Sequence, residues 1–567
     1  MVDHHKSNAR LLLKGDIATF ITGPAPPGDA NILTYPPGYP IIMAIVFKAF
    51  GESDTSMRLF QVIFDAGAAV LLFLLAAQLL PVKAAAIAGM LAALSPQFAY
   101  YSLILLPDSL ATLPILLAIY FIIRAKKSNS FRAVVAAGAL VGLSCWLRSN
   151  ALMLAPFLAM LVFVLTERGR RLRYAAALIG AAILVIAPIT VRNLVIFHHF
   201  IPISLGMGQM LNVGISDYDR ERKFGLPGTD IETVTSEAER YQRPDYAQSL
   251  FGGNGIEREQ QRTARALAVV KSHPVWFAEI VLARAASMLR LERVHRVETA
   301  PGVTSNLVVA EKTQPVWARA PADLVRADAS VQTQTSASLS PDGQAFVVES
   351  NAPDLRYQLV SPPIAVERNT DYLLIIPLKV DQGNVVIEIT SAEIAGGDSL
   401  QRYGSTPVLS PLERINPAAQ HLDIHEIAFV SRDSDLISVR LDNAGRGGKT
   451  VVRLGRLELF RLGSGSLLWT RYVRTLVHTA QRFFLTAAML PLAFIGMALL
   501  WLAGRGRVIL ILLAVPAYYL CFQSVLHTEY RYVLPAQPFI YLMVGVTLYF
   551  AALTVGRLIR KETRQTK

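Results

Sequence analysis

The stretch 174–195, YAAALIGAAILVIAPITVRNLV, decides the fold class, because Arg192 is its only charged residue. A helix that crosses about 30 Å of hydrocarbon needs about 20 predominantly apolar residues, and this stretch is long enough. Eight further stretches of similar character occur near 58–80, 84–104, 108–124, 131–148, 150–166, 482–503, 507–525 and 533–556. We therefore expect a polytopic α-helical membrane protein of about 9–10 helices.

The composition of the whole chain agrees with this expectation. Of 567 residues, 53% are hydrophobic and only 17% are charged, and the mean hydropathy is +0.39. A soluble domain carries about a quarter charged residues, so a disordered chain, a collagen-like repeat and an ordinary soluble enzyme are excluded. Cys145 and Cys521 each lie inside an apolar run, which leaves neither a disulfide framework nor a cysteine zinc site.

The basic residues predict the orientation of the chain. The net charge of +13 would indicate a nucleic-acid partner if these residues lined one face, but they form short clusters between apolar runs, so we expect no nucleic acid. The clusters are Lys83, Arg124 to Arg132, Arg168 to Arg173, Arg505 with Arg507, and the tail from Arg557 to Lys567. All fall on one side if each span is counted once. The positive-inside rule places that side and the C-terminus in the cytoplasm of a plasma (inner) membrane protein.

Residues 1–56 are expected to lie outside, as an external loop followed by a juxtamembrane helix. The apolar run from Pro40 to Phe50 is too short to span and opens with Tyr35-Pro36-Pro37-Gly38-Tyr39-Pro40. Treating it as a span would also break the alternation of sides. This placement leaves no segment to carry the N-terminus across the membrane, so we expect an upstream helix to be missing from this chain.

The remaining boundaries follow from changes in composition. We expect an N-terminal transmembrane bundle at 57–196, an external loop with amphipathic helices at 197–314, a β-domain at 315–462, and C-terminal transmembrane helices with a basic tail at 463–567. Residues 197–481 are expected to be extracytoplasmic. In 315–462, β-branched runs such as Val385–Ile389 alternate with hairpin-like turns at 381–384 and 443–448, which is typical of an all-β sandwich.

Several charged residues at the expected outer ends of spans could carry chemistry, because charge beside a bilayer is costly. Asp108 follows Pro107, where it could simply cap a helix. Arg148, and likewise Arg192 with Asn193, could bind a phosphate or extend toward water. The last outer loop, Glu529-Tyr530-Arg531-Tyr532, offers an arginine clamp for a phosphate or an ordinary aromatic belt.

Other motifs exclude further classes of function. The adjacent pairs His4-His5 and His198-His199 cannot direct both rings at one metal from a helix, so we predict no metal-binding residues. The sequence holds no glycine-rich phosphate loop, nucleophile elbow or HExxH motif, which argues against a nucleotide-driven pump and a membrane protease.

Taken in order, these pieces resemble a known family. They resemble the GT-C membrane glycosyltransferases that use polyprenyl-phosphate sugars, in the branch of the protein O-mannosyltransferases and the lipid A aminoarabinose transferase. The matching pieces are Ala9–Gly15, Tyr35–Pro40, Arg58, Ser95-Pro96, Asp108, Gly142 to Arg148, Pro188, Arg192-Asn193, Gly206 to Gly214 and Glu529–Pro535. The β-domain in turn resembles jelly-roll-like carbohydrate-binding modules.

The resemblance implies the chemistry and its residues. An acceptor hydroxyl would attack a polyprenyl-phosphate-linked sugar on the extracytoplasmic side, with a lipid, glycan or protein as acceptor. The family's first-loop acid would fall at or just before Met1, so Asp3 is the nearest catalytic candidate, and Asp108 resembles the second acid. Arg531, with Glu529 and Tyr532, is expected to bind the donor phosphate, followed by Arg148, Arg192 and Asn193. Tyr35, Pro37 and Tyr39 are expected near the site.

Two other classes stay open at this point. A lipid-glycan transporter would want polar residues along a path through the membrane, and Asp65 is the main one that lies deep. A non-catalytic or truncated glycan-binding protein would explain the displaced first-loop acid, which would leave the chain inactive as given. No cofactor is certain, a divalent metal stays an alternative, and membrane lipid is an expected partner.

Overall fold

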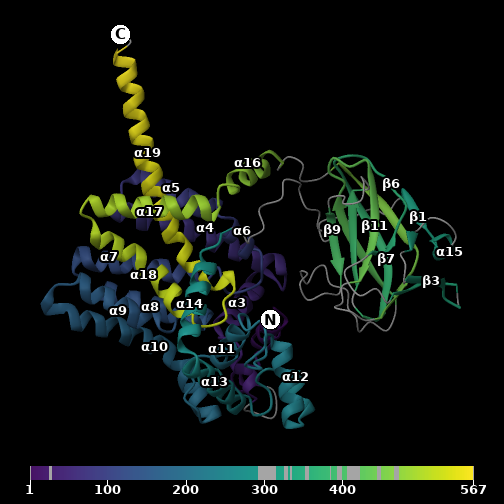
Figure 1. Ribbon diagram of the computed structural model, residues 1–567, viewed down its shortest axis with the longest axis horizontal. Helices are drawn as coiled ribbons and strands as arrows, with labels where there is room; N and C mark the ends of the chain where they lie inside the picture. Colours follow the sequence, from purple (N-terminus) through teal and green to yellow (C-terminus); the bar gives the residue numbers. More distant parts are fainter. Residues whose placement is uncertain are drawn as a thin grey trace. The chain divides into compact units, whose positions relative to one another are not determined.

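The computed structural model describes residues 2–23, 29–291 and 314–565, apart from 325–329, 332–334, 342, 351–356, 384, 392–398, 405–421, 444–448 and 465–470. The chain divides into two compact units, one formed by 1–297 with 479–567 and the other by 298–478. The first unit is helical and the second is built from strands (Figure 1). The β-domain expected at 315–462 lies inside the second unit.

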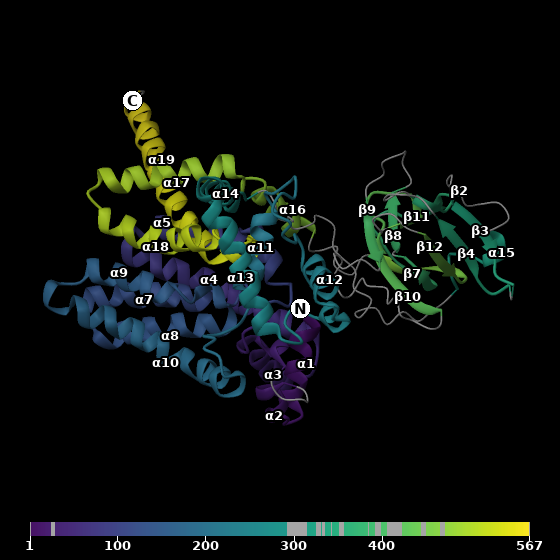
Figure 2. The same ribbon diagram turned by 60° about the horizontal axis from the view of Figure 1, so that its bottom comes forward.

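The helical unit contains the apolar stretches that the sequence predicts as spans, although only some of them form single long helices. Its helices are α1 (Val2–Leu13), α2 (Ile17–Thr22), α3 (Gly38–Phe50), α4 (Asp54–Leu79), α5 (Val82–Leu94), α6 (Pro96–Tyr101), α7 (Thr112–Ser128), α8 (Phe131–Leu147), α9 (Leu154–Leu165), α10 (Arg171–Phe197), α11 (Met207–Ser216), α12 (Asp230–Tyr241), α13 (Gly255–Ser272), α14 (Pro274–Met288), α17 (Thr486–Leu502), α18 (Gly506–Gln523) and α19 (Gln537–Gln565). In both views α7, α8, α9 and α10 lie side by side (Figure 2).

Several of these helices meet the requirements of a membrane span. Within the described residues, four are long and apolar enough to cross in one run: α4, 168–197 with α10, α18, and 530–557 with most of α19. Two bent pairs, α13 with α14 and α16 (Arg471–Gln481) with α17, raise this to six if each pair is one span. The protein is a multi-pass membrane protein, and the fold class expected from the sequence is confirmed.

The expected span at 84–104 is wrong as a single helix. Ser95 ends α5, and its hydroxyl accepts a hydrogen bond from the Phe98 amide at the start of α6. Pro96 occupies the first position of α6, where its missing N–H costs nothing, but it cannot continue the preceding helix. Residues 102–111 then run without regular helix to α7, so Asp108 lies in a connection rather than in the first turn of a span.

Small residues let the helices approach closely. A Cβ on Gly138 of α8 would lie 2.1 Å from the carbonyl oxygen of Leu178 in α10. Close packing of backbones is the usual way in which membrane helices associate, because lipid supplies no hydrophobic driving force between them. The contact packs the middle of α8 closely against α10.

Hydrogen bonds show that the basic turns share one end of the bundle. Lys127 donates to the Gln78 carbonyl (2.8 Å) and Arg505 donates to the Leu79 carbonyl (3.2 Å). The connection at 102–111, the end of α8 and the loop after α18 contact one another instead, as described below. The turn after α4, the end of α7 and the turn before α18 therefore lie together at one end of the bundle. Which end faces the cytoplasm stays a prediction from the positive-inside rule.

The second unit is a two-sheet sandwich. One sheet has the order β1 (Trp317–Arg319), β13 (Leu457–Ser464), β7 (Thr370–Gln382), β12 (Thr450–Leu454), β4 (Phe346–Ser350), β3 (Thr335–Leu339), with β10 (Asp423–Val430) also pairing with β7. The other has β2 (Ser330–Val331), β5 (Tyr357–Val360), β11 (Leu436–Asn443), β8 (Val385–Ser391), β9 (Ser399–Gly404), with β6 (Ile364–Ala365) pairing with β11. The pairs are antiparallel, and Leu374 and Ile389 from opposite sheets share one core.

The hairpin-like turn at 381–384 connects the two sheets instead of forming a hairpin. β7 belongs to the first sheet and β8 to the second, so the chain crosses over the edge of the sandwich at Gly383, which has a φ of 79°. The turn signal was recognised from composition, but composition does not say which strands pair. The turn expected at 443–448 lies largely outside the described residues, between β11 and β12, which also belong to different sheets.

Candidate active site

An ion pair between Asp108 and Arg148 lies at the centre of the candidate site. The Asp108 carboxylate is 2.9 Å from Nη2 of Arg148, and the two side chains are 1% and 16% exposed. Asp108 comes from the connection before α7 and Arg148 from the residue after α8. In the described part of the chain, neither carboxylate oxygen receives a hydrogen bond from another side chain. Asp108 is therefore more buried than Arg148 and forms an ion pair with it.

A second guanidinium group lies beside the first. The Arg148 guanidinium is 4.5 Å and that of Arg531 is 5.2 Å from the centroid of the same Tyr532 ring. Arg531 pairs with Glu529 at 2.7 Å, and the Tyr532 hydroxyl reaches the same carboxylate at 3.4 Å. Asp108, Arg148 and the Glu529–Tyr532 loop therefore lie together, whereas Arg192 lies in another hollow.

Asn150 ties this loop to α8. Its side-chain amide donates to the Tyr532 carbonyl (3.3 Å) and to Gln523 Oε1 (3.4 Å), while its own carbonyl accepts from the Tyr518 hydroxyl (2.6 Å). Tyr532 and Arg531 belong to the 3₁₀ helix η9 (Tyr530–Ala536), which leads into α19. These bonds hold together two segments that are 382 residues apart in the sequence.

The N-terminal segment adds an aromatic wall. The His5 ring contacts those of Tyr35 and Tyr39 at centroid distances of 5.2 and 5.0 Å, and the Tyr39 hydroxyl donates to Gln61 at 2.7 Å. Burial and the neighbouring His4 charge lower the pKa of His5 to about 3, so its ring is neutral near pH 7. Burial and then the Asp230 charge raise the pKa of Tyr35, which stays a protonated donor.

Arg192 lies in a separate hollow. Its lining residues are His4, Asn8, Phe20, Ile32, Tyr35, Pro36, Pro37, Pro40 and Arg192. The guanidinium donates to Asn193 Oδ1 (2.9 and 2.6 Å), whose own amide donates to the carbonyls of Ile201 and Ile203. Asn193 is fully buried, so it orients Arg192 rather than facing a ligand. Tyr35 and Pro37 line this hollow, whereas Tyr39 is buried beneath them.

Asp3 belongs to the first turn of α1, but its side chain lies outside the described part of the chain. Its role as the catalytic acid of the first loop stays a prediction. The helix itself packs against α3 and carries His4 and His5 to the aromatic wall. The backbone of Asp3 is therefore on the element that borders both the wall and the Arg192 hollow.

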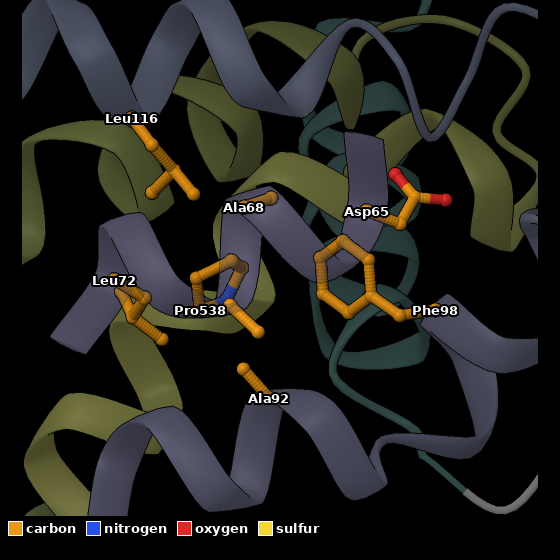
Figure 3. Close-up of a pocket in the computed structure, with 8 residues that line it drawn as sticks. Asp65, Ala68, Leu72, Ala92, Phe98, Leu116 and Pro538 are labelled. Carbon is orange, nitrogen blue, oxygen red and sulfur yellow. The ribbon is translucent and has the colours of Figure 1, made fainter. Parts of the chain in front are cut away.

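A narrow apolar hollow lies between α4, α5, α6, α7 and α19 (Figure 3). Its lining residues are Asp65, Ala68, Ala69, Leu72, Ala92, Phe98, Leu116 and Pro538, so all but Asp65 are apolar.

Part of the chain matches a known family. Residues 34–193 match the family model described as dolichyl-phosphate-mannose-protein mannosyltransferase. The family resemblance of the sequence is confirmed. The matched range includes the Pro-rich segment, Asp108, Arg148, Arg192 and Asn193, and glycosyl transfer is the activity that this match supports. No curated protein matches the chain in sequence.

Two solved structures of membrane glycosyltransferases are similar at a low level. Against ArnT from Cupriavidus metallidurans in the apo state, the identity is 16% and the TM-score 0.27, over 50% of this chain and 58% of that one. Against arabinosyltransferase EmbB from Mycobacterium smegmatis, the identity is 12% and the TM-score 0.23, over 80% of this chain and 65% of that one. The chain thus spans less than two thirds of either length.

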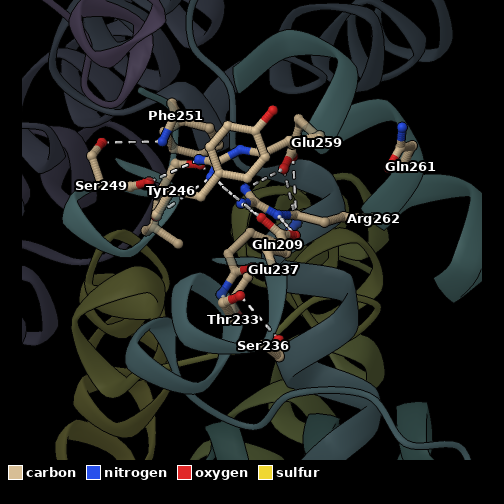
Figure 4. A network of polar contacts seen from close by, with 12 residues as sticks. Gln209, Thr233, Ser236, Glu237, Tyr246, Ser249, Phe251, Glu259, Gln261 and Arg262 are labelled. Carbon is tan, nitrogen blue, oxygen red and sulfur yellow. Dashed lines mark hydrogen bonds and ion pairs between the residues drawn. The ribbon is translucent and has the colours of Figure 1, made fainter. Parts of the chain in front are cut away.

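A buried charged network among α11, α12 and α13 was not predicted from the sequence. Arg262 of α13 is fully buried and makes a two-bond pair with Glu237 of α12 at 2.8 and 2.7 Å, and Glu259 accepts from the amides of Gly206 and Gly208 at the start of α11 (Figure 4). The pairing could not be found from spacing, because its members come from three helices. These bonds hold α11, α12 and α13 together.

We expect Glu237→Gln to destabilise the helical unit without changing substrate preference. The change leaves Arg262 buried beside a neutral amide, and removing one partner of a buried pair costs about 3–5 kcal/mol. Thermal unfolding of the detergent-solubilised chain should show a clear fall in the midpoint. Glu239→Gln, an exposed acid on the same helix, is the matched control, and equal midpoints for the two variants would contradict the assigned role.

Proposed function

We propose that this protein transfers a sugar from a polyprenyl-phosphate donor to an acceptor hydroxyl on the extracytoplasmic side of the membrane. The observation that carries the proposal is the pair of guanidinium groups, Arg148 and Arg531, on one Tyr532 ring. Planar arginine forks suit a phosphate, and two of them from different segments suit a group that must be held while it leaves. The opposite end carries the basic turns that favour the cytoplasm.

The reaction needs little beyond positioning and charge. The acceptor oxygen forms a bond to the anomeric carbon, while the bond from that carbon to the phosphate oxygen breaks and its electron pair leaves with the lipid phosphate. The arginines stabilise the negative charge that develops on the phosphate. The hydroxyl proton must pass to a base, for which Asp3 on α1 is the proposed residue; such proton transfer contributes about 10²–10⁴-fold.

Asp108 is better suited to holding Arg148 than to taking this proton. Its side chain is only 1% exposed, and the Arg148 guanidinium lies against it. A general base must come within hydrogen-bond reach of the acceptor hydroxyl. We therefore assign Asp108 the positioning of Arg148, which modifies the catalytic role expected from the family resemblance.

The hollow lined by Arg192, Asn8 and Tyr35 borders α1, which carries Asp3, and we assign this side of the site to the acceptor. Within the described residues, no three His, Cys, Asp or Glu side chains gather as metal ligands, so the divalent metal left open by the sequence has no ligand set there.

A reconstituted transfer assay tests the proposal. The full chain is placed in liposomes with radiolabelled polyprenyl-phosphate sugars and membrane-extract acceptors, and transferred label is followed by chromatography and mass spectrometry. We expect lipid-phosphate-dependent transfer by the wild-type chain and background transfer by Arg531→Ala. Donor binding without transfer would favour the non-catalytic glycan-binding alternative. Movement of intact donor across the bilayer would favour the transporter.

A further inference from the structure

Arg284 on α14 is a buried arginine outside the arginine pair of the site. Its side chain is 4% exposed. Its Nη1 donates to the carbonyls of Ser524 (2.7 Å) and Leu526 (2.9 Å), and its Nη2 donates to the carbonyl of Gly214. One guanidinium group thus binds three backbone carbonyls, two of them in the loop that follows α18.

The same loop contacts α11 at several further points. The amide of His527 donates to the Met210 carbonyl at 2.8 Å, and its ring nitrogen Nδ1 lies 2.7 Å from Asp217. Gly214 permits this approach, because a Cβ there would lie 2.7 Å from the His527 nitrogen and 3.1 Å from Arg284 Nη2. The external helices α11 and α14 therefore hold the loop from one side.

Two residues after His527, the loop supplies the charges of the site. Glu529 pairs with Arg531, and Asn150 holds the Tyr532 carbonyl from the other side. The segment 524–532 is thus fixed at one end by Arg284 and at the other by Asn150. Because no regular helix covers 524–529, its shape depends on these side-chain to backbone bonds.

We infer that Arg284 is a positioning residue that sets the 524–532 loop, and through it the Arg531 guanidinium, in the geometry that binds the donor phosphate. The expected loss of donor binding rests on the proposed function, whereas the expected change in the 524–532 loop rests on the contacts alone. A lysine has a single ammonium group and cannot reproduce the planar fork that binds three carbonyls. The external region therefore contributes to the site, although it supplies none of the arginines beside Tyr532.

The test compares Arg284→Lys and Arg284→Ala with Arg290→Ala, an exposed arginine just beyond the same helix. Misplacement of a binding group by about 1 Å can cost about 10²-fold. We expect a loss of that order in kcat/KM for the donor in both Arg284 variants, with the KM for the acceptor unchanged. Millimolar guanidinium ion should partly restore Arg284→Ala, because it can occupy the same three carbonyls.

Hydrogen exchange of the purified full chain provides the second arm and needs no substrate. We expect faster amide exchange, largest in the 524–532 loop and in α11, in both Arg284 variants, with a thermal midpoint below that of Arg290→Ala because buried carbonyls lose their donor. Unchanged exchange in the loop, or a global loss of protection, would overturn the positioning role. If wild-type transfer is absent with every donor, the proposed function fails, while this arm still decides the inference.

Discussion

Arg531→Ala should reduce kcat/KM for the lipid-phosphate donor by at least about 10²-fold, the loss seen when a single donor to a developing oxyanion is removed. The guanidinium is 14% exposed and lies against Tyr532, with Glu529 at 2.7 Å. Alanine removes both the charge and the planar fork. Arg531→Lys retains the charge alone and should recover only part of the activity.

A double-mutant cycle with Arg148 shows whether both arginines act on one phosphate. Residues that act on the same group are not additive, whereas independent sites add. We expect the combined Arg148→Gln and Arg531→Ala variant to lose much less than the product of the two single losses. Arg168→Ala, an exposed arginine of the opposite end, serves as the control in the same liposome assay. Fully additive losses in the double variant, or wild-type transfer by Arg531→Ala, would contradict the proposal that both arginines bind the donor phosphate.

The membrane helices and the general position of the site could be predicted because both depend on local patterns. Apolar runs predict the spans, and basic turns predict which ends of the spans face the cytoplasm. Because successive spans alternate in direction, every second turn lies at the same end of the bundle. Asp108, Arg148 and Arg531 were placed together by this reasoning, and their contacts agree. The separate roles proposed for Asp108 and Arg148 could not be predicted, since they depend on which of the two side chains is the more buried.

Three-dimensional partners explain what the sequence could not provide. In the sequence, Arg284 is only an interruption of an amphipathic helix, because the carbonyls that it binds lie 70, 240 and 242 residues away. Arg192 and Asn193 read as a second phosphate site, yet Asn193 uses its amide on the carbonyls of Ile201 and Ile203. The turn at 381–384 carried a correct signal, but its strands belong to different sheets. In each case the residue type indicated a polar role or a turn, but the sequence did not indicate which distant residue would be its partner.

Asp108→Asn should impair the donor step and destabilise the protein together, because it leaves Arg148 without its charge partner. The carboxylate is 2.9 Å from Nη2 and almost fully buried, and breaking a pair of this kind costs about 3–5 kcal/mol. We expect a lower thermal midpoint and a donor KM raised by at least about 10-fold, the ratio that corresponds to 1.4 kcal/mol of lost binding.

The pH profile separates this positioning role from a role as general base. If Asp108 takes the acceptor proton, Asp108→Asn should remove the acidic limb of the pH–rate profile for transfer, because that limb reports the base of the free enzyme. If Asp108 holds Arg148, the limb should persist and the loss should lie in the donor KM. Joining Asp108→Asn with Arg148→Met should recover part of the lost stability, since no uncompensated charge is then buried. A lost acidic limb with an unchanged donor KM would return the catalytic role to Asp108.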